Sequence, residues 1–334
     1  MLVDNATGRI VVGKLADLTH MSGQSRNFAR TEAVNIANCE HPNIIQLLDT
    51  YEANESLLHI LEYADAGDLM TQVECRAKHV DQRNSDNVSN MSKGLNRPVP
   101  FYYMENEILV ILAQLCLAIK YIHDKKIMHR DLKTPNVLLT KSGLIKLGDF
   151  GFSRQYDKSL SDDVGRTFCG TPCYLSPELW RRESYSYKAD IWSLGVLLYE
   201  LMTLRKPFPS TNMRDLMQRV LKEGSYDPLP TDRYSQGLCD LCRSMLRVNP
   251  QERPSIIEVL ATPILLKEGL QYLKTNVPRL RDVDQAVRDR LVREVDAVQR
   301  MCSVPTLSVV PSSVSMTTEE SREMSGAVDE LRRA

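Results

Sequence analysis

One run of eight residues, His129 to Asn136 (HRDLKTPN), gathers side chains that suit chemistry. Asp131 and Asn136 offer hard oxygen atoms, and Lys133 places a positive charge two residues after Asp131. Eighteen residues beyond Asp131 stands a further carboxylate, Asp149, in the triplet Asp-Phe-Gly. Hard oxygens of this kind are the ligands that Mg²⁺ prefers. Together these groups suit phosphoryl transfer, which needs positioning and neutralisation of phosphate charge more than covalent chemistry.

Two more motifs follow in order: Gly170-Thr171-Pro172 and then Ser176-Pro177-Glu178. An Asp-Phe-Gly triplet alone would mean little. The whole series of motifs in this order and spacing is a strong signal, because chance would have to produce agreement at many positions simultaneously. On these motifs the chain resembles the eukaryotic protein kinase family, and the likeness runs from residue 1 to about residue 266.

The resemblance assigns a role to each of these residues. It implies that Asp131 is the catalytic base, that Lys133 reaches the γ-phosphate, and that Asn136 and Asp149 hold Mg²⁺. Thr171 stands where family members bond the catalytic Asp and Lys. Lys133 and Thr171 are both typical of serine/threonine kinases rather than tyrosine kinases.

A lysine that would anchor ATP is expected at the end of a short β-branched run. Lys14 follows Val-Val-Gly, and Glu32 lies eighteen residues further on, inside a predicted helix. The resemblance assigns Lys14 to the α- and β-phosphates and Glu32 to its ion pair. Gly13 departs from the apolar residue that is usual before this lysine. Solvated surface charges are the alternative interpretation of Lys14 and Glu32.

The rest of the ATP site follows from the same register. Six positions are expected to line it: Val12 and Leu138 on either side of the adenine ring, Leu61 as the gatekeeper, Glu62 and Ala64 in a hinge whose backbone holds the adenine edge, and Asp68 near the ribose. For Val12, Leu61 and Leu138, simple core packing is an alternative that the sequence does not separate.

Three residues are expected to act as scaffold. Glu178 and Arg253 would form the buried ion pair that anchors the activation segment, and Asp190 would cap the backbone of the 129–136 loop. Thr167 lies between Asp149 and Glu178 and is predicted to be an activating phosphorylation site.

Two arginines could bind a phosphate on Thr167. Arg130 adjoins the catalytic Asp131, and Arg154 follows Gly151 by three residues. Charge-assisted hydrogen bonds from two converging arginines would order the segment. The alternative is an exposed threonine in a mobile loop.

Finer motifs resemble one branch of the family, the NIMA-related (NEK) kinases. They are the segments that contain Asp149, residues 166–178, and residues 202–208. Cys173 stands where NEK members usually have Tyr, and Pro135 where Gln is common. Calcium/calmodulin-type and other serine/threonine kinases are the nearest competitors. The branch implies roles in cell division, cilia or basal bodies.

The glycine-rich loop of the family has no counterpart in this sequence. Only thirteen residues precede Lys14, and Met1 to Val3 resemble the end of the second strand. We expect either a truncated gene prediction, which we favour, or a naturally shortened kinase. A site open on this side would bind ATP weakly. An inactive pseudokinase that acts as a binding scaffold is therefore the rival function, although every downstream catalytic residue is present.

The resemblance implies a two-lobed α+β protein kinase fold, whose helices and strands would position these residues. The expected kinase domain covers residues 1–266, and a helical or disordered tail follows over 267–334. Within the domain we expect a partial β-rich N-lobe over 1–61, a hinge over 62–68 and a helical C-lobe over 69–266. The C-lobe is expected to contain a loop insertion at 79–98. Hydrophobic periodicity predicts strands at 10–12, 43–48 and 57–61, and helices at 25–37, 108–122, 191–202 and 282–300.

Composition narrows the partners and the compartment. Lys and Arg number 42 against 43 Asp and Glu, a balance that gives no electrostatic reason to bind nucleic acid or a membrane surface. The apolar run from Ile108 to Ile119 is shorter than a bilayer requires. Eight scattered cysteines indicate reduced thiols in a cytoplasmic protein, and the Cys239–Cys242 pair fits a helix face better than a zinc site. The expected partners are ATP, protein substrates and an unidentified protein that binds the tail.

Overall fold

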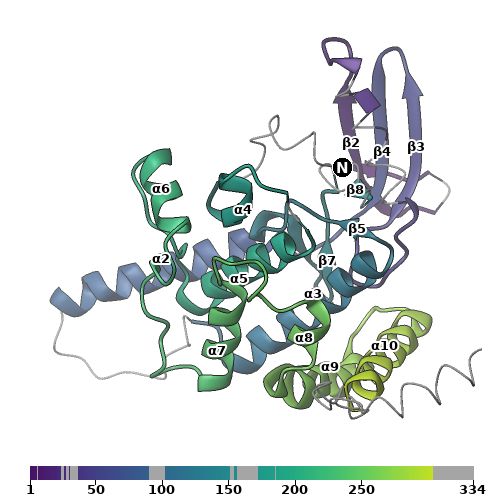
Figure 1. Ribbon diagram of the computed structural model, residues 1–334. Helices are drawn as coiled ribbons and strands as arrows, with labels where there is room; N and C mark the ends of the chain where they lie inside the picture. Colours follow the sequence, from purple (N-terminus) through teal and green to yellow (C-terminus); the bar gives the residue numbers. More distant parts are fainter. Residues whose placement is uncertain are drawn as a thin grey trace, which may run out of the picture.

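A computed structural model describes residues 1–5, 7–23, 26–27, 30, 37–89, 102–150, 154–155, 172–184 and 186–303. Figure 1 shows a small sheet set above and to one side of a larger group of helices, so the expected two-lobed α+β architecture is confirmed. The buried hydrophobic core lies mainly in the helical C-lobe.

The N-lobe is an antiparallel sheet of four strands. They are β1 (Leu2–Val3), β2 (Ile10–Asp17), β3 (Leu47–Ala53) and β4 (Ser56–Glu62), in the spatial order β1-β2-β4-β3. The predicted strands at 10–12 and 57–61 are therefore confirmed within longer elements. β3 and β4 join through Asn54 and Glu55, whose φ angles of 49° and 56° are those of a tight hairpin turn.

The predicted strand at 43–48 is wrong for most of its length, because β3 begins only at Leu47. Residues 43–45 attach instead to the C-lobe, where Leu147 donates its N–H to the carbonyl of Asn43 and accepts from the N–H of Ile45. At Gln46 the chain returns to the sheet, and the N–H of Glu62 donates to the Gln46 carbonyl at 3.0 Å. A β-branched run predicted the extended backbone but not the lobe that it pairs with.

Two buried helices form the centre of the C-lobe. α3 (Glu105–Asp124) and α5 (Lys188–Thr203) contain the helices predicted at 108–122 and 191–202. Within the described residues, α3 is the one helix long and apolar enough to cross a membrane, but 67% of its most apolar window is buried inside the protein. That burial is typical of the core helix of a globular lobe.

The other C-lobe elements surround this centre. They are β5 (Ile127–Met128), η1 (Thr134–Asn136), β6 (Val137–Leu139), β7 (Ile145–Leu147), β8 (Arg154–Gln155), η3 (Pro172–Tyr174), α4 (Pro177–Trp180), α6 (Met213–Val220), α7 (Gln236–Met245) and α8 (Ile256–Leu260). Cys239 and Cys242 are both buried on α7, as the helix-face interpretation predicted.

The loop predicted at 79–98 is wrong for its first half, because α2 runs from Leu69 to Ser89. The polar composition after His79 suggested a loop, but no Gly or Pro interrupts the sequence from 69 to 89. Ala77 and Val80 pack against the core, which supports the helix beyond its buried start. Residues 90–98, and most of the helix predicted at 25–37, lie outside the described residues.

The chain continues past α8 through η4 (Ile264–Gly269, π-helical), α9 (Leu270–Asn276), η5 (Val277–Arg279) and α10 (Gln285–Ser303). The amphipathic helix predicted at 282–300 is confirmed, and its apolar residues Leu291, Val295 and Val298 are buried. Figure 1 shows α10 beside α9, at the edge of the C-lobe.

Candidate active site

A short hairpin brings two of the predicted site residues together. β6 and β7 pair antiparallel with Val137 opposite Leu147, so the residues just before β6 and just after β7 are neighbours. The N–H of Gly148 donates to the carbonyl of Asn136 at 2.9 Å. Asn136 and Asp149 therefore lie at the same end of the hairpin although thirteen residues separate them in the chain.

The 129–136 loop folds its polar side chains onto Asp131. Lys133 donates from Nζ to Oδ2 of Asp131 at 2.7 Å, and Asn136 donates from Nδ2 to the same oxygen at 2.9 Å. A second bond from Asn136 Nδ2 to the Asp131 carbonyl, at 2.8 Å, fixes the orientation of the amide. Both amide hydrogens are directed at Asp131, so the amide oxygen of Asn136 faces away from it. Within the described ranges no such bond reaches Oδ1 of Asp131, which is the oxygen that could accept a proton.

Lys14 reaches this site from the other lobe. Its Nζ lies 2.9 Å from Oδ1 of Asp149, and the two side chains are 43% and 39% exposed. The pair is too exposed to add much stability. It does place a positive and a negative charge at the open edge between the lobes, where phosphate oxygens and a cation could bind.

Asp190, at the start of α5, holds the backbone of the 129–136 loop as predicted. It accepts from the N–H of His129 and of Arg130, each at 2.9 Å, and lies 2.8 Å from Nε2 of His123. Burial raises the pKa of Asp190, but these hydrogen bonds outweigh burial and leave the pKa below its usual value. Arg130, with φ 67°, needs this support because its backbone is left-handed.

His129 joins the loop to the residues around Asp149. Its Nε2 donates to the carbonyl of Gly148 at 3.1 Å, and its ring packs edge-on to Phe150 at 4.9 Å. Burial lowers the pKa of His129, which favours the neutral ring that this arrangement needs. The N–H of Asp131 donates to Nδ1, so the tautomer is fixed on both sides.

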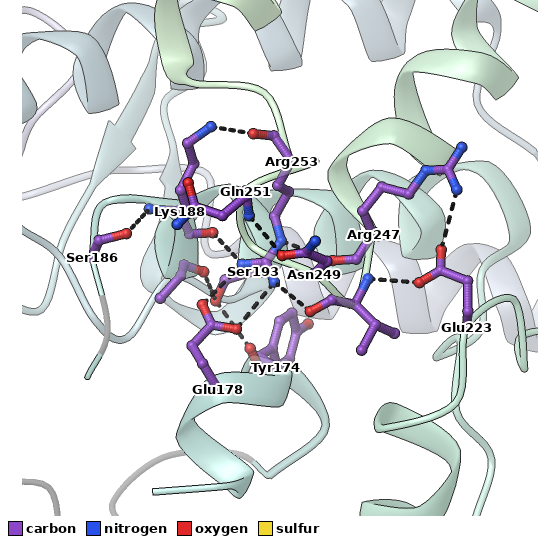
Figure 2. Close-up of polar contacts among 12 residues, drawn as sticks. Tyr174, Glu178, Ser186, Lys188, Ser193, Glu223, Arg247, Asn249, Gln251 and Arg253 are labelled. Atoms are coloured by element: carbon purple, nitrogen blue, oxygen red, sulfur yellow. Dashed lines mark hydrogen bonds and ion pairs between the residues drawn. The ribbon is translucent and has the colours of Figure 1, made fainter. Parts of the chain in front are cut away.

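The predicted scaffold pair is present. Arg253 donates from its two terminal nitrogens to the two carboxylate oxygens of Glu178 at 2.9 and 3.0 Å, and the side chains are 0% and 2% exposed. Figure 2 shows Arg253 at the centre of a wider set of polar contacts, including bonds to the carbonyls of Arg247 and Lys188 at 3.0 and 2.6 Å. The pair ties α4 to the segment after α7.

The positions expected around adenine are brought together by pairing. Val12 lies directly opposite Leu61 in the β2–β4 ladder, and Leu138 forms a bridge with Asp68. All four side chains are half-buried. Partial exposure of Val12, Leu61 and Leu138 is what an apolar ligand surface requires and what a closed core does not.

The predicted hinge begins at Glu62, the last residue of β4, and continues through Ala64 toward the C-lobe. The N–H of Glu62 is already used by Gln46, so an adenine contact at Glu62 would fall to its carbonyl oxygen. Its side chain pairs with Lys146 at 2.7 Å, a contact the sequence did not predict.

A further buried network supports the 129–136 loop and was missed by the sequence. Glu200 accepts from Lys206 at 2.5 Å and from the hydroxyl of Tyr174, and that hydroxyl also contacts the hydroxyl of Thr134 at 3.0 Å. Burial raises the pKa of Tyr174, which keeps its hydroxyl a donor. Glu200 is the one carboxylate in the otherwise largely apolar stretch 191–202 of α5, and a buried charge requires partners. That exception was the available signal.

Some predicted residues lie outside the described part of the chain. Glu32, Thr167 and Thr171 are among them, and only the backbone of Arg154 is described, in β8. The pairing of Glu32 with Lys14 and the binding of a phosphate on Thr167 therefore stay predictions.

The donor set fits a magnesium ion shared with a nucleotide. Asp149 and Asn136 would supply one carboxylate and one amide oxygen at the end of the hairpin, and Mg²⁺ commonly takes its remaining ligands from phosphates and water. No group of three or more His, Cys, Asp or Glu side chains in the described ranges could hold a metal unaided.

Comparison with known proteins decides the family. Residues 1–265 match the protein kinase domain. The chain belongs to the protein kinase family. This kinase chain is 42% identical over 291 residues to "Putative serine/threonine-protein kinase A" of Trypanosoma brucei brucei, an alignment that covers 87% of the chain and 62% of the relative.

The NEK resemblance is confirmed by similarity as well. The kinase chain is 36% identical over 266 residues to "Serine/threonine-protein kinase Nek1" of Mus musculus, covering 80% of the chain and 20% of the relative. It thus spans less than two thirds of the length of these relatives.

Proposed function

We propose that this chain transfers the γ-phosphate of ATP to serine or threonine hydroxyls of protein substrates. The observation that carries the proposal is the cluster of Lys133 and Asn136 on Asp131, next to the Lys14–Asp149 pair. Relatives named as serine/threonine kinases, NEK kinases among them, support the same activity.

We assign each side chain a task on the basis of its contacts. Asp131 accepts the proton of the substrate hydroxyl at Oδ1, and the bond from Asn136 to Oδ2 holds the carboxylate in place for that transfer. Lys133, within 2.7 Å of Asp131, offsets negative charge on the transferring phosphoryl group. Lys14 binds oxygens of the phosphates that stay behind.

Magnesium would bind to Asp149 and Asn136, where it neutralises phosphate charge. The half-buried Val12, Leu61 and Leu138 would hold the adenine ring, and the exposed Lys14 would set the phosphates toward Asp131. Under this proposal the binding groups follow the order adenine, phosphates, substrate hydroxyl.

The test is transfer of labelled phosphate from Mg-ATP to a generic protein substrate, followed by identification of the phosphorylated amino acid. Asp131→Asn and Asp149→Ala should each reduce activity at least about a hundredfold, in line with general-base and charge-stabilising roles. Asp232→Asn, at an exposed turn remote from the site, is the matched control and should be fully active. Retention of more than a few per cent of activity in either site variant would refute the assignment.

A further inference from the structure

The last described helix, α10, contacts the chain segment that follows the predicted Glu32 helix. α10 lies beyond the residues that match the kinase domain, which end at 265. Its apolar face is buried, but Arg290 and Glu294 on the same helix extend to Glu40 and His41. A helix outside the matched domain thus holds a segment of the N-lobe.

The contact at His41 is buried. Nε2 of His41 lies 2.7 Å from Oε2 of Glu294, and the His41 side chain is 1% exposed. The other ring nitrogen accepts the N–H of Asn43 at 2.9 Å, so the ring proton sits on Nε2, facing the carboxylate. The angle is too bent for a regular hydrogen bond, so the attraction is mainly electrostatic. Burial raises the pKa of Glu294, but His41 and Arg290 outweigh burial and leave it lowered.

Arg290 adds a second attachment. It donates to the backbone carbonyl of Glu40 at 2.5 Å and to Oε1 of Glu294 at 3.2 Å. Its guanidinium lies 5.9 Å from the ring of Tyr121 on α3, and that ring is 5.0 Å from the ring of His41. One arginine thereby links α10, α3 and the segment at 40–41.

The same segment is bonded to the strand that leads to the metal-binding residue. Asn43 accepts the N–H of Leu147 at 2.8 Å, and Ile45 donates to the Leu147 carbonyl at 2.9 Å. The side chain of Asn43 also donates to the carbonyl of Ile145 at 2.9 Å. Leu147 precedes Asp149 by two residues. A continuous set of contacts therefore runs from Glu294 to the active site.

We propose that Arg290 and Glu294 are positioning residues for phosphoryl transfer, because α10 fixes residues 40–45 and through them the end of β7 at Asp149. The inference rests on the proposed function. Residues 38–43 contain no helix or strand that spans them, so contacts with neighbouring elements determine where this segment lies.

The experiment compares the full chain with Arg290→Ala, Glu294→Gln and the double variant. Arg293→Ala is the matched arginine control, since Arg293 is exposed on the same helix, and Glu268→Gln is the matched carboxylate control in η4. Three quantities are measured: deuterium uptake of peptides covering 37–48 and 144–150, kcat and KM for ATP, and the thermal midpoint.

We expect Arg290→Ala, Glu294→Gln and the double variant to raise deuterium uptake in both peptides and to lower kcat about three- to tenfold. The thermal midpoint should move by about 4 °C or less, because the apolar face of α10 stays buried. The controls should change none of the three. Arg290→Lys, which can still donate to the Glu40 carbonyl, should recover part of kcat.

Faster exchange confined to 37–48 with unchanged kcat would overturn the proposal, as would no change in either peptide. If the unaltered chain transfers no phosphate to any substrate, the proposed function fails. In that case faster exchange at 144–150 in the double variant would still show that α10 holds the end of β7, and its absence would refute the proposal separately.

Discussion

Replacing Arg253 by Met should lower the free energy of unfolding far more than the loss of an exposed ion pair does. Arg253→Met removes two hydrogen bonds of 2.9 and 3.0 Å and leaves the Glu178 carboxylate, 2% exposed, without its cation. It also removes the donors to the carbonyls of Arg247 and Lys188. Breaking a buried pair from one side destabilises by about 3–5 kcal/mol. At roughly 2–4 °C per kcal/mol, the melting temperature should fall by about 6–20 °C.

Urea denaturation followed by circular dichroism measures this effect. Arg243→Met is the matched control, since its ion pair with Asp240 on α7 is 38% and 58% exposed and should contribute less than about 1 kcal/mol. Adding Glu178→Leu to Arg253→Met should restore part of the loss, because no buried charge is then left unpaired. A loss under about 1 kcal/mol in Arg253→Met would show that the carboxylate finds water or another partner, and the reasoning would be wrong.

Three further predictions concern the site. Lys14→Met should raise KM for ATP at least about tenfold with little change in stability, because its pair with Asp149 is exposed; an unchanged KM would exclude Lys14 from phosphate binding. Thr167→Ala should lower activity, and Arg130→Ala should make activity independent of Thr167 phosphorylation. Mass spectrometry would report the phosphate on Thr167, and full activity of protein that lacks this phosphate would contradict the prediction. The lowered pKa of Asp190 predicts that its carboxylate stabilises the fold fully above about pH 4 and that this contribution is lost as the pH falls through the lowered pKa. Denaturation curves measured against pH should show a smaller decline in Asp190→Asn.

The sequence could predict which of these residues lie together because they stand in short local motifs. Asp131, Lys133 and Asn136 lie within six residues, and the hairpin that brings Asp149 to them is short. Glu178 and Arg253 are 75 residues apart, and only the family resemblance could pair them. The structure then supplied the distances and the burial.

The missed features depend on contacts between distant segments. Residues 43–45 have the composition of a strand, but whether they pair with the sheet or with Leu147 is decided by Asn43, whose side chain bonds Gln114 on α3. The extension of α2 past His79 was missed because the polar sequence after His79 lacks hydrophobic periodicity.

The bond between Glu62 and Gln46 has a mechanical consequence. The chain passes between the lobes twice, once after Ile45 and once after Glu62, and these two crossings are joined by the Glu62 N–H and by the Gln46 N–H, which donates to the Glu62 side chain at 3.1 Å. Because the two crossings are bonded to each other, a displacement of one should carry the other with it. Any movement between the lobes should therefore shift both connections together, and it would change the distance between Lys14 and Asp149 at the same time.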